Sequence, residues 1–153
     1  MRRAAMITAV LAVTLAGSCS SSSNLTYFDA TLSPDNEVPA RASGASGVAR
    51  LTFDGTTVTY IVIVSKFDNF TMGHIHSGVA GANGPVRVFL YGPSTARSID
   101  QGTLVEGSFT ASNVTGIDFG ALLDEMRAGT AYVNFHTTLY PSGEIRGQVR
   151  LLN

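Results

Sequence analysis

Residues 47–64 read GVARLTFDGTTVTYIVIV and predict a β-hairpin. Apolar residues recur at every second position from Ala49 to Phe53, which gives the first strand one apolar face. Asp54-Gly55 is a turn dipeptide that hairpins favour. The returning strand, VTYIVIVS at 58–65, is apolar on both faces, so we expect it to be central in a sheet and covered on both sides.

Further strands lie on both sides of this hairpin, separated by loops rich in Gly, Pro, Asn and Asp. We expect them at 25–32, 71–78, 86–91, 103–110, 131–137 and 143–152. One segment, IDFGALLDEMRAG at 117–129, has the apolar spacing of a short helix, with Asp118 as its cap and Gly129 as its end. We expect the helix to close one end of the fold. The sequence therefore predicts an all-β protein, an immunoglobulin-like or Greek-key antiparallel β-sandwich with one short helix.

The last two strands predict a hairpin around the turn LYPSG. The sequence allows two registers for this hairpin. One sets His136 opposite Gly147 and mixes the core and outer faces, whereas the other sets His136 opposite Arg146. We predict the second, because a one-residue slip inverts every side chain. Phe135 and Ile145 should then be buried, with His136 and Arg146 on the opposite face.

Composition limits the classes of function. The 153 residues are 44% hydrophobic and 14% charged, which suffices for one core. The formal net charge of −1 argues against nucleic-acid binding, which needs a basic face. Ser142 has no histidine–acid pair near it in sequence, and no other nucleophile–base set is visible, so we expect no enzymatic activity.

The N-terminus has the features of an export signal. Two arginines precede an apolar run from Ala4 to Leu15 and the residues LAGSC, which end at the single cysteine, Cys19. LAGSC resembles a lipobox, although Ala16 stands where that pattern prefers Leu; the alternative is a plain secretory signal cut after Ser18. We expect a lipoprotein signal peptide at 1–19, a Ser-rich tether at 20–24 and one domain at 25–153.

Five motifs spread over this domain carry a family resemblance: NEVPA from Asn36, GHIHSG from Gly73, NGPV from Asn83, AYVNFHT from Ala131 and YPSGEIRGQV from Tyr140. In this order they resemble the CHRD domain, which is named after chordin and also occurs in bacterial secreted proteins. Gly73 departs from the family, which often has Ala there. The resemblance implies an immunoglobulin-like fold outside the cytoplasm and implies little about activity. The family motifs also contain the polar residues Glu37, Asn134, Glu144 and Arg146.

The chain has three histidines, and their placement is the sharpest clue to function. His74 and His76 flank Ile75, the natural core residue, so both should face away from the core. His136 is expected on the same outer face, and if the strands are neighbours the three imidazoles share one patch. Three histidines with an open position suit zinc or copper, so these two ions are the candidate cofactors. The arrangement is similar to the His-x-His copper site of copper-zinc superoxide dismutase, but a dismutase site needs more histidines.

The alternative is a polar network without metal. A histidine beside Asn134, Glu144 or Arg146 can complete hydrogen bonds that fix a hairpin, and Arg146 opposite His136 would repel a cation. Glu37 could be a metal or ligand group, but a charged residue after a turn is more often a surface or capping carboxylate, and we expect that role. Glu144 and Arg146 are interpreted as an exposed ion pair that contributes little.

Two functions from different classes follow. The first is a monomeric, non-enzymatic binding or structural module that a lipid on Cys19 holds to the outer side of a membrane. In a cell with two membranes we expect the outer one, because Ser20 follows the cysteine. The second is a copper or zinc protein that uses His74, His76 and His136.

Overall fold

The structure is a computed structural model that describes residues 25–152. These residues form eight strands and one α-helix: β1 Thr26–Leu32, β2 Ser46–Phe53, β3 Val58–Ser77, β4 Val86–Tyr91, β5 Arg97–Phe109, α1 Phe119–Ala128, β6 Ala131–Thr137, β7 Ile145–Gln148 and β8 Arg150–Leu151. Two single 3-10 turns, η1 Pro34–Asn36 and η2 Ala111–Asn113, complete the set. The predicted all-β antiparallel sandwich with one short helix is confirmed. Cys19, the predicted signal peptide and the tether lie outside the described residues.

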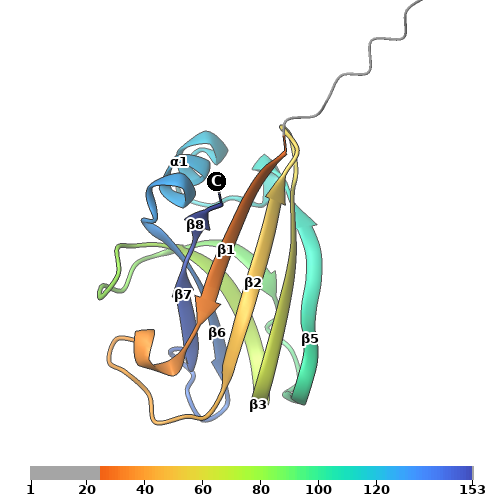
Figure 1. Cartoon of the computed structure of the whole chain (residues 1–153), viewed down its shortest axis with the longest axis vertical. Coiled ribbons are helices and arrows are strands. Elements are labelled where there is room, and N and C mark those ends of the chain that lie inside the picture. Colours follow the sequence, from red (N-terminus) through yellow and green to blue (C-terminus); the bar gives the residue numbers. More distant parts are fainter. Residues whose placement is uncertain (1–24, 153) are drawn as a thin grey trace, which may run out of the picture.

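Strand β3 is 20 residues long and belongs to both layers of the sandwich. Its first half pairs with β2 and β5, and its second half pairs with β6 and β4 (Figure 1). We predicted two separate strands here, and that was wrong. The chain turns at Lys66 and Asn69, both at positive φ, but Phe67 and Phe70 stay paired with β5 through the bend. Continuous pairing therefore carries one strand from the first layer into the second.

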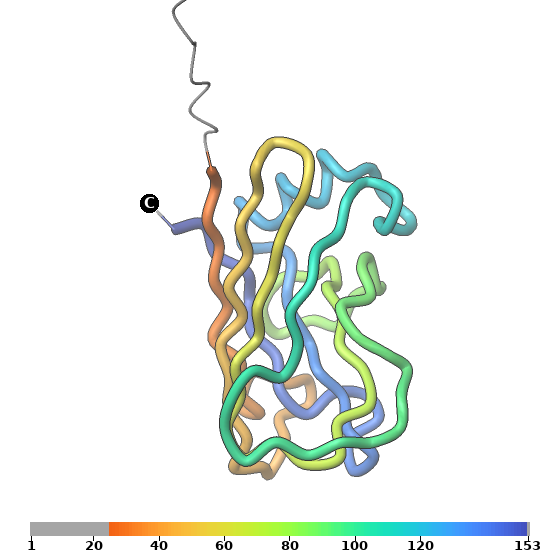
Figure 2. The backbone as a smooth tube through the Cα atoms, turned by 90° about the vertical axis from the view of Figure 1, so that its right-hand side faces the viewer, coloured from red at the N-terminus to blue at the C-terminus, as the bar shows by residue number. Residues whose placement is uncertain are grey.

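The first and last strands complete an almost closed sheet. β8 pairs with β1, and the backbones of Ser33 and Arg146 exchange two hydrogen bonds. Figure 2 shows the C-terminal segment running beside the first strand. Among the connections between strands are the β1–β2 loop (33–45), the β3–β4 loop (78–85) and the β6–β7 loop (138–144).

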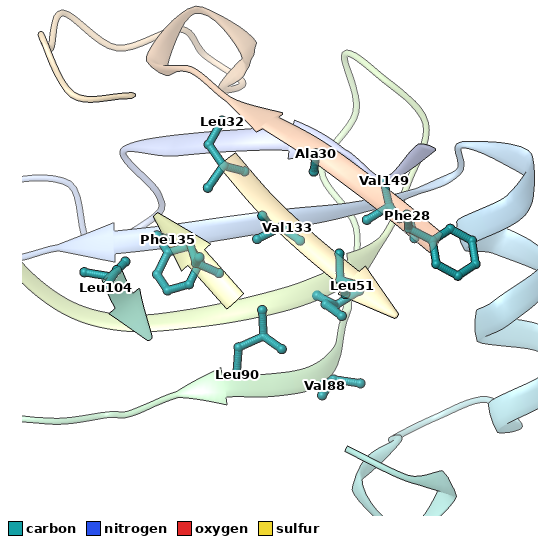
Figure 3. Close-up of a cluster of buried hydrophobic side chains, with 14 of the residues drawn as sticks. Phe28, Ala30, Leu32, Leu51, Val88, Leu90, Leu104, Val133, Phe135 and Val149 are labelled. Carbon is teal, nitrogen blue, oxygen red and sulfur yellow. The ribbon is translucent and has the colours of Figure 1, made fainter. Parts of the chain in front are cut away.

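The core lies between the two layers (Figure 3). Its side chains come from nearly every strand and include Phe28, Leu32, Leu51, Val62, Phe67, Ile75, Val88, Leu104, Val133, Phe135, Ile145 and Val149. The expectation that the strand at 58–65 is covered on both sides was wrong, because Ile63 on its outer face is 44% exposed.

Helix α1 lies at one end of the sandwich, near β8 (Figure 1). Its own residues Leu122, Leu123 and Met126 are buried, and Gly129 ends it in the left-handed conformation. Asp118 precedes the helix as expected, but its side chain makes no capping hydrogen bond. Within residues 25–152, no helix has both the length and the apolar character needed to cross a membrane.

The last hairpin differs from the predicted register by two residues. Arg146 lies opposite Asn134, not His136, and Phe135 lies opposite Ile145. The β6–β7 loop is longer than expected, because the first ladder bond after it runs from the Glu144 amide to the Phe135 carbonyl. A shift of two keeps every side chain on its face, so Phe135 and Ile145 are buried in the core as predicted.

Candidate metal centre

Strands β3 and β6 place the three histidines on the outer face of the second layer. His74 lies opposite Asn134, which is two residues from His136 on β6. Ile75 is fully buried in the core, so its neighbours His74 and His76 lie on the other face of β3. The structure therefore brings all three imidazoles together.

This outer face is covered by loops. His74, His76 and His136 are only 4%, 8% and 6% exposed. The β3–β4 loop supplies the carbonyl of Gly84 next to His76, and the β6–β7 loop supplies the carbonyl of Pro141 next to His136. The histidines are thus largely shielded from solvent, and electrostatic interactions are stronger there than in bulk water.

Two backbone carbonyls fix the tautomers of two rings. His76 Nδ1 is 2.9 Å from the Gly84 oxygen, and His136 Nδ1 is 2.9 Å from the Pro141 oxygen. A carbonyl only accepts, so each Nδ1 carries the proton and each Nε2 presents a lone pair. A metal-binding histidine in proteins commonly donates its other N–H in this way, which fixes the ring and makes it a better ligand.

The ring nitrogens are close enough to serve one ion. His74 Nδ1 and His136 Nε2 are hydrogen-bonded at 3.0 Å, a bond that an ion would replace, and one nitrogen from each of the three rings lies within 4.8 Å of the others. Ligands of one tetrahedral zinc ion lie about 3.4 Å apart, since each bond is about 2.1 Å. Rotation of the rings would bring the three nitrogens to this spacing, and the residue types therefore fit a zinc or copper ion.

The pKa values of all three histidines are lowered. Burial, followed by the nearby His136 and His76, lowers the pKa of His74 from 6.5 to about 4. For His76 and His136 burial is also the largest cause, and in each case the hydrogen bond to a backbone carbonyl opposes it. The three imidazoles are neutral at pH 7, which is the form that binds metal.

Beside the histidines lies a buried ion pair. Arg146 and Glu37 are 2% and 4% exposed, and Arg146 Nε is 3.9 Å from Glu37 Oε2. Arg146 also donates to the carbonyl oxygens of Asn36 and Ala82 and to Oδ1 of Asn83, so it ties the β1–β2 and β3–β4 loops to β7. Burial raises the pKa of Glu37 to about 7, against the opposing effect of the guanidinium.

Three expectations about these polar residues are corrected. Glu37 is buried under Arg146 and is not a surface carboxylate. Glu144 does not pair with Arg146, since its carboxylate accepts hydrogen bonds from Ser43 and Thr137, at 2.6 Å each. Neither acid is exposed, because the loops that cover this face take the place of solvent.

A family model of the CHRD domain matches residues 28–149. The chain belongs to the CHRD domain family. The resemblance predicted from its five motifs is thereby confirmed. No curated protein and no solved structure matches the chain.

Tyr132 is a member of this cluster in the CHRD domain that was not predicted as a site residue. The centroid of its ring lies 4.8 Å from that of His76 and the two ring planes are 10° apart, so the rings stack. The guanidinium carbon of Arg146 lies 4.7 Å from the centroid of the same tyrosine ring. The Tyr132 hydroxyl accepts from the Gly84 amide. Tyr132 precedes His136 by four residues on β6, and alternate residues of a strand share a face. The sequence could therefore have placed this tyrosine on the same face as the histidine.

Gly73, where CHRD domains often have Ala, is explained by packing. A Cβ at this position would overlap the ring of Phe135, which lies directly over the glycine. The glycine lets β3 and β6 hold that ring in the core while the histidines stay on the other face.

Buried polar atoms without a hydrogen-bond partner gather around the histidines. Among the described residues they are Glu37 Oε1, His74 Nε2, His76 Nε2, Asn134 Oδ1 and Arg146 Nη2. Asn134 joins them into one group, since it lies opposite both His74 and Arg146. Buried polar groups are normally paired, so this part of the CHRD domain has unused capacity to bind a ligand.

Proposed function

We propose that this CHRD domain binds a copper or zinc ion through His74, His76 and His136. The observation that carries the proposal is the geometry of the three rings, with ligand nitrogens within 4.8 Å of one another. Two Nε2 lone pairs are oriented by Nδ1–H bonds to backbone carbonyls. The bound ion would link β3 to β6 and stabilise the loops that cover them.

The second candidate is a structural or binding module without metal, and the Arg146 network favours it. Arg146 joins the covering loops to β7 through three hydrogen bonds that need no ion. In such a network, however, the histidine nitrogens should also be paired, and Nε2 of His74 and Nε2 of His76 are not. This difference favours metal binding.

The charge of Arg146 acts against a cation only in part: it is one of the causes that lower the pKa of His76, but it also has partners of its own. We expected the guanidinium to lie opposite His136 and repel an ion. It lies instead against the Tyr132 ring and the Glu37 carboxylate, which balances its charge when ionised.

Unfolding of the protein with and without metal tests the proposal. The protein is the full chain with Cys19→Ser, so that its single cysteine cannot bind the ion. Zn²⁺ or Cu²⁺ at a hundredfold excess over the dissociation constant should raise the free energy of unfolding by about 2.7 kcal/mol. His76→Asn should abolish most of the increase. No increase, or an equal increase in the variant, would overturn metal binding.

We further propose that the domain acts outside the cytoplasm, held to a membrane by a lipid on Cys19. The residues LAGSC and the tether SSSSN at 20–24 support this, and β1 begins two positions after the tether, at Thr26. The wild-type protein should partition into the detergent phase, and Cys19→Ser should not. Wild-type protein with a free, unmodified N-terminus in the medium would contradict the anchor.

A further inference from the structure

Met72 lies next to the histidines on the outer face of β3. It is opposite His136 in the register with β6, and it precedes His74 by two residues on the same strand. Opposed residues in an antiparallel pair have Cβ atoms about 4.5–5.5 Å apart, and next-but-one residues on one strand lie about 7 Å apart. The methionine therefore borders two of the three proposed ligands.

An irregularity in β3 is what places Met72 there. Phe70, two residues earlier, is fully buried in the core, so regular alternation would turn Met72 to the core as well. The register with β6 shifts between Phe70 and Met72. This shift sends Met72 to the same face as His74. Irregularities of this kind are frequent next to functional sites, where they redirect a side chain.

The surroundings of Met72 suit a ligand more than a core residue. Met72 is half-buried, and Gly92 passes so close that a Cβ there would lie 3.2 Å from the Met72 Cβ. The chain after β4 thus covers it on the side away from β6. The side chain has three rotatable bonds, so its sulfur can reach towards His136 and His74.

We propose that the Met72 thioether is a fourth ligand and that the centre holds copper as Cu(I). This inference rests on the proposed three-histidine site. Thioethers are soft ligands that select Cu(I), whereas zinc in proteins takes nitrogen, thiolate and carboxylate ligands. A neutral set of three imidazoles and one thioether in a buried site also favours a singly charged ion over a doubly charged one.

The test compares the affinities of the full chain carrying Cys19→Ser for two ions. Cu(I) is measured anaerobically by competition with bicinchoninate, and Zn²⁺ by competition with a zinc-binding dye. Met72→Leu should lower the Cu(I) affinity at least tenfold and leave the Zn²⁺ affinity within about twofold. Leu and Met have similar volumes, so the fold should tolerate the change. X-ray absorption of the Cu(I) protein should show a sulfur ligand that Met72→Leu removes.

Met126→Leu is the matched control, because Met126 lies on the inner side of α1, fully buried in the core, and its replacement should not affect the binding of either ion. Unchanged Cu(I) affinity in Met72→Leu, together with loss of binding in His76→Asn, would overturn the role of Met72 and leave the three-histidine site standing. A parent protein that binds neither ion would overturn both.

Discussion

The two halves of β3 have opposite outer faces. In the first half, Thr59 and Ile63 lie open to solvent, and Ile63 is 44% exposed. In the second half, His74 and His76 are at most 8% exposed. One strand therefore exposes a large aliphatic side chain and buries two imidazoles, the reverse of what polarity alone would predict.

The difference lies in what covers each face. The β1–β2 and β3–β4 loops fold over the second half and are held there by Arg146, which hydrogen-bonds to residues of both. The site is therefore made by loops that Arg146, paired with Glu37, fixes to the sheet. Its stability and its chemistry should depend on that pair.

Removing Arg146 should have the largest effect. Arg146→Met keeps the volume but leaves Glu37 buried without its partner and two carbonyls without a donor, which should cost about 3–5 kcal/mol of unfolding free energy. Urea denaturation measures this. Arg50→Met, on the exposed outer face of β2, is the matched control and should change little.

If both arginine variants lose the same small amount of unfolding free energy, the pair does not hold the loops on the sheet. A double variant, Arg146→Met with Glu37→Gln, measures the coupling between the two residues. That variant should be more stable than the two single effects added together, because the residues are coupled.

Acid should destabilise the metal-free protein through the histidines. His74 has a pKa of about 4 when folded and 6.5 when unfolded, so the unfolded chain binds more protons between these values. Stability should fall as pH drops from 6.5 to 4, by roughly 3 kcal/mol for this group.

The measurement is the difference in unfolding free energy between wild type and His74→Asn across this pH range, with a chelator present. Glu37 acts in the opposite direction, because its pKa is raised to about 7 and its contribution is lost as pH rises from 4.5 to 7. Glu37 is present in both proteins, so most of its effect cancels. A difference that does not change with pH would show that His74 is not held neutral.

Gly73→Ala should have an intermediate effect. The new Cβ would overlap the Phe135 ring, and overpacking of a core typically costs about 1–3 kcal/mol. Gly44→Ala is the control, because no atom lies within 4 Å of the added Cβ. Equal stabilities of the Gly73→Ala and Gly44→Ala proteins in thermal unfolding would mean that the Phe135 ring can move aside, and that β3 and β6 are not tightly packed at this point.

The smallest effect is expected in the exposed half of β3. Ile63→Thr keeps a β-branched residue on a partly exposed face and should change the unfolding free energy by no more than about 0.5 kcal/mol. Ile75→Thr, on the core face of the second half, should cost at least about 2 kcal/mol. Similar losses for the two variants would remove the distinction between the outer and core faces.

Local patterns in the sequence were enough for the fold class. Alternation from Ala49 to Phe53, the Asp54-Gly55 turn and the ends of the helix near Asp118 and Gly129 depend on neighbours in the chain, so the sequence contains them directly. The same holds for the two faces of β6, since alternate residues share a face whatever the partner strand is.

Only the tertiary structure decided how the second layer is built and covered. The union of 58–77 into one strand depends on pairing with β5 through the bend, and the register of the last hairpin depends on how the β6–β7 loop closes. The burial of Glu37 and Arg146 depends on the β1–β2 loop meeting strand β7, where Asn36 and Arg146, 110 residues apart in the chain, are hydrogen-bonded. Long-range contacts of this kind leave no periodic signal in the sequence, because periodicity reports which face a residue takes and not what comes to lie against it.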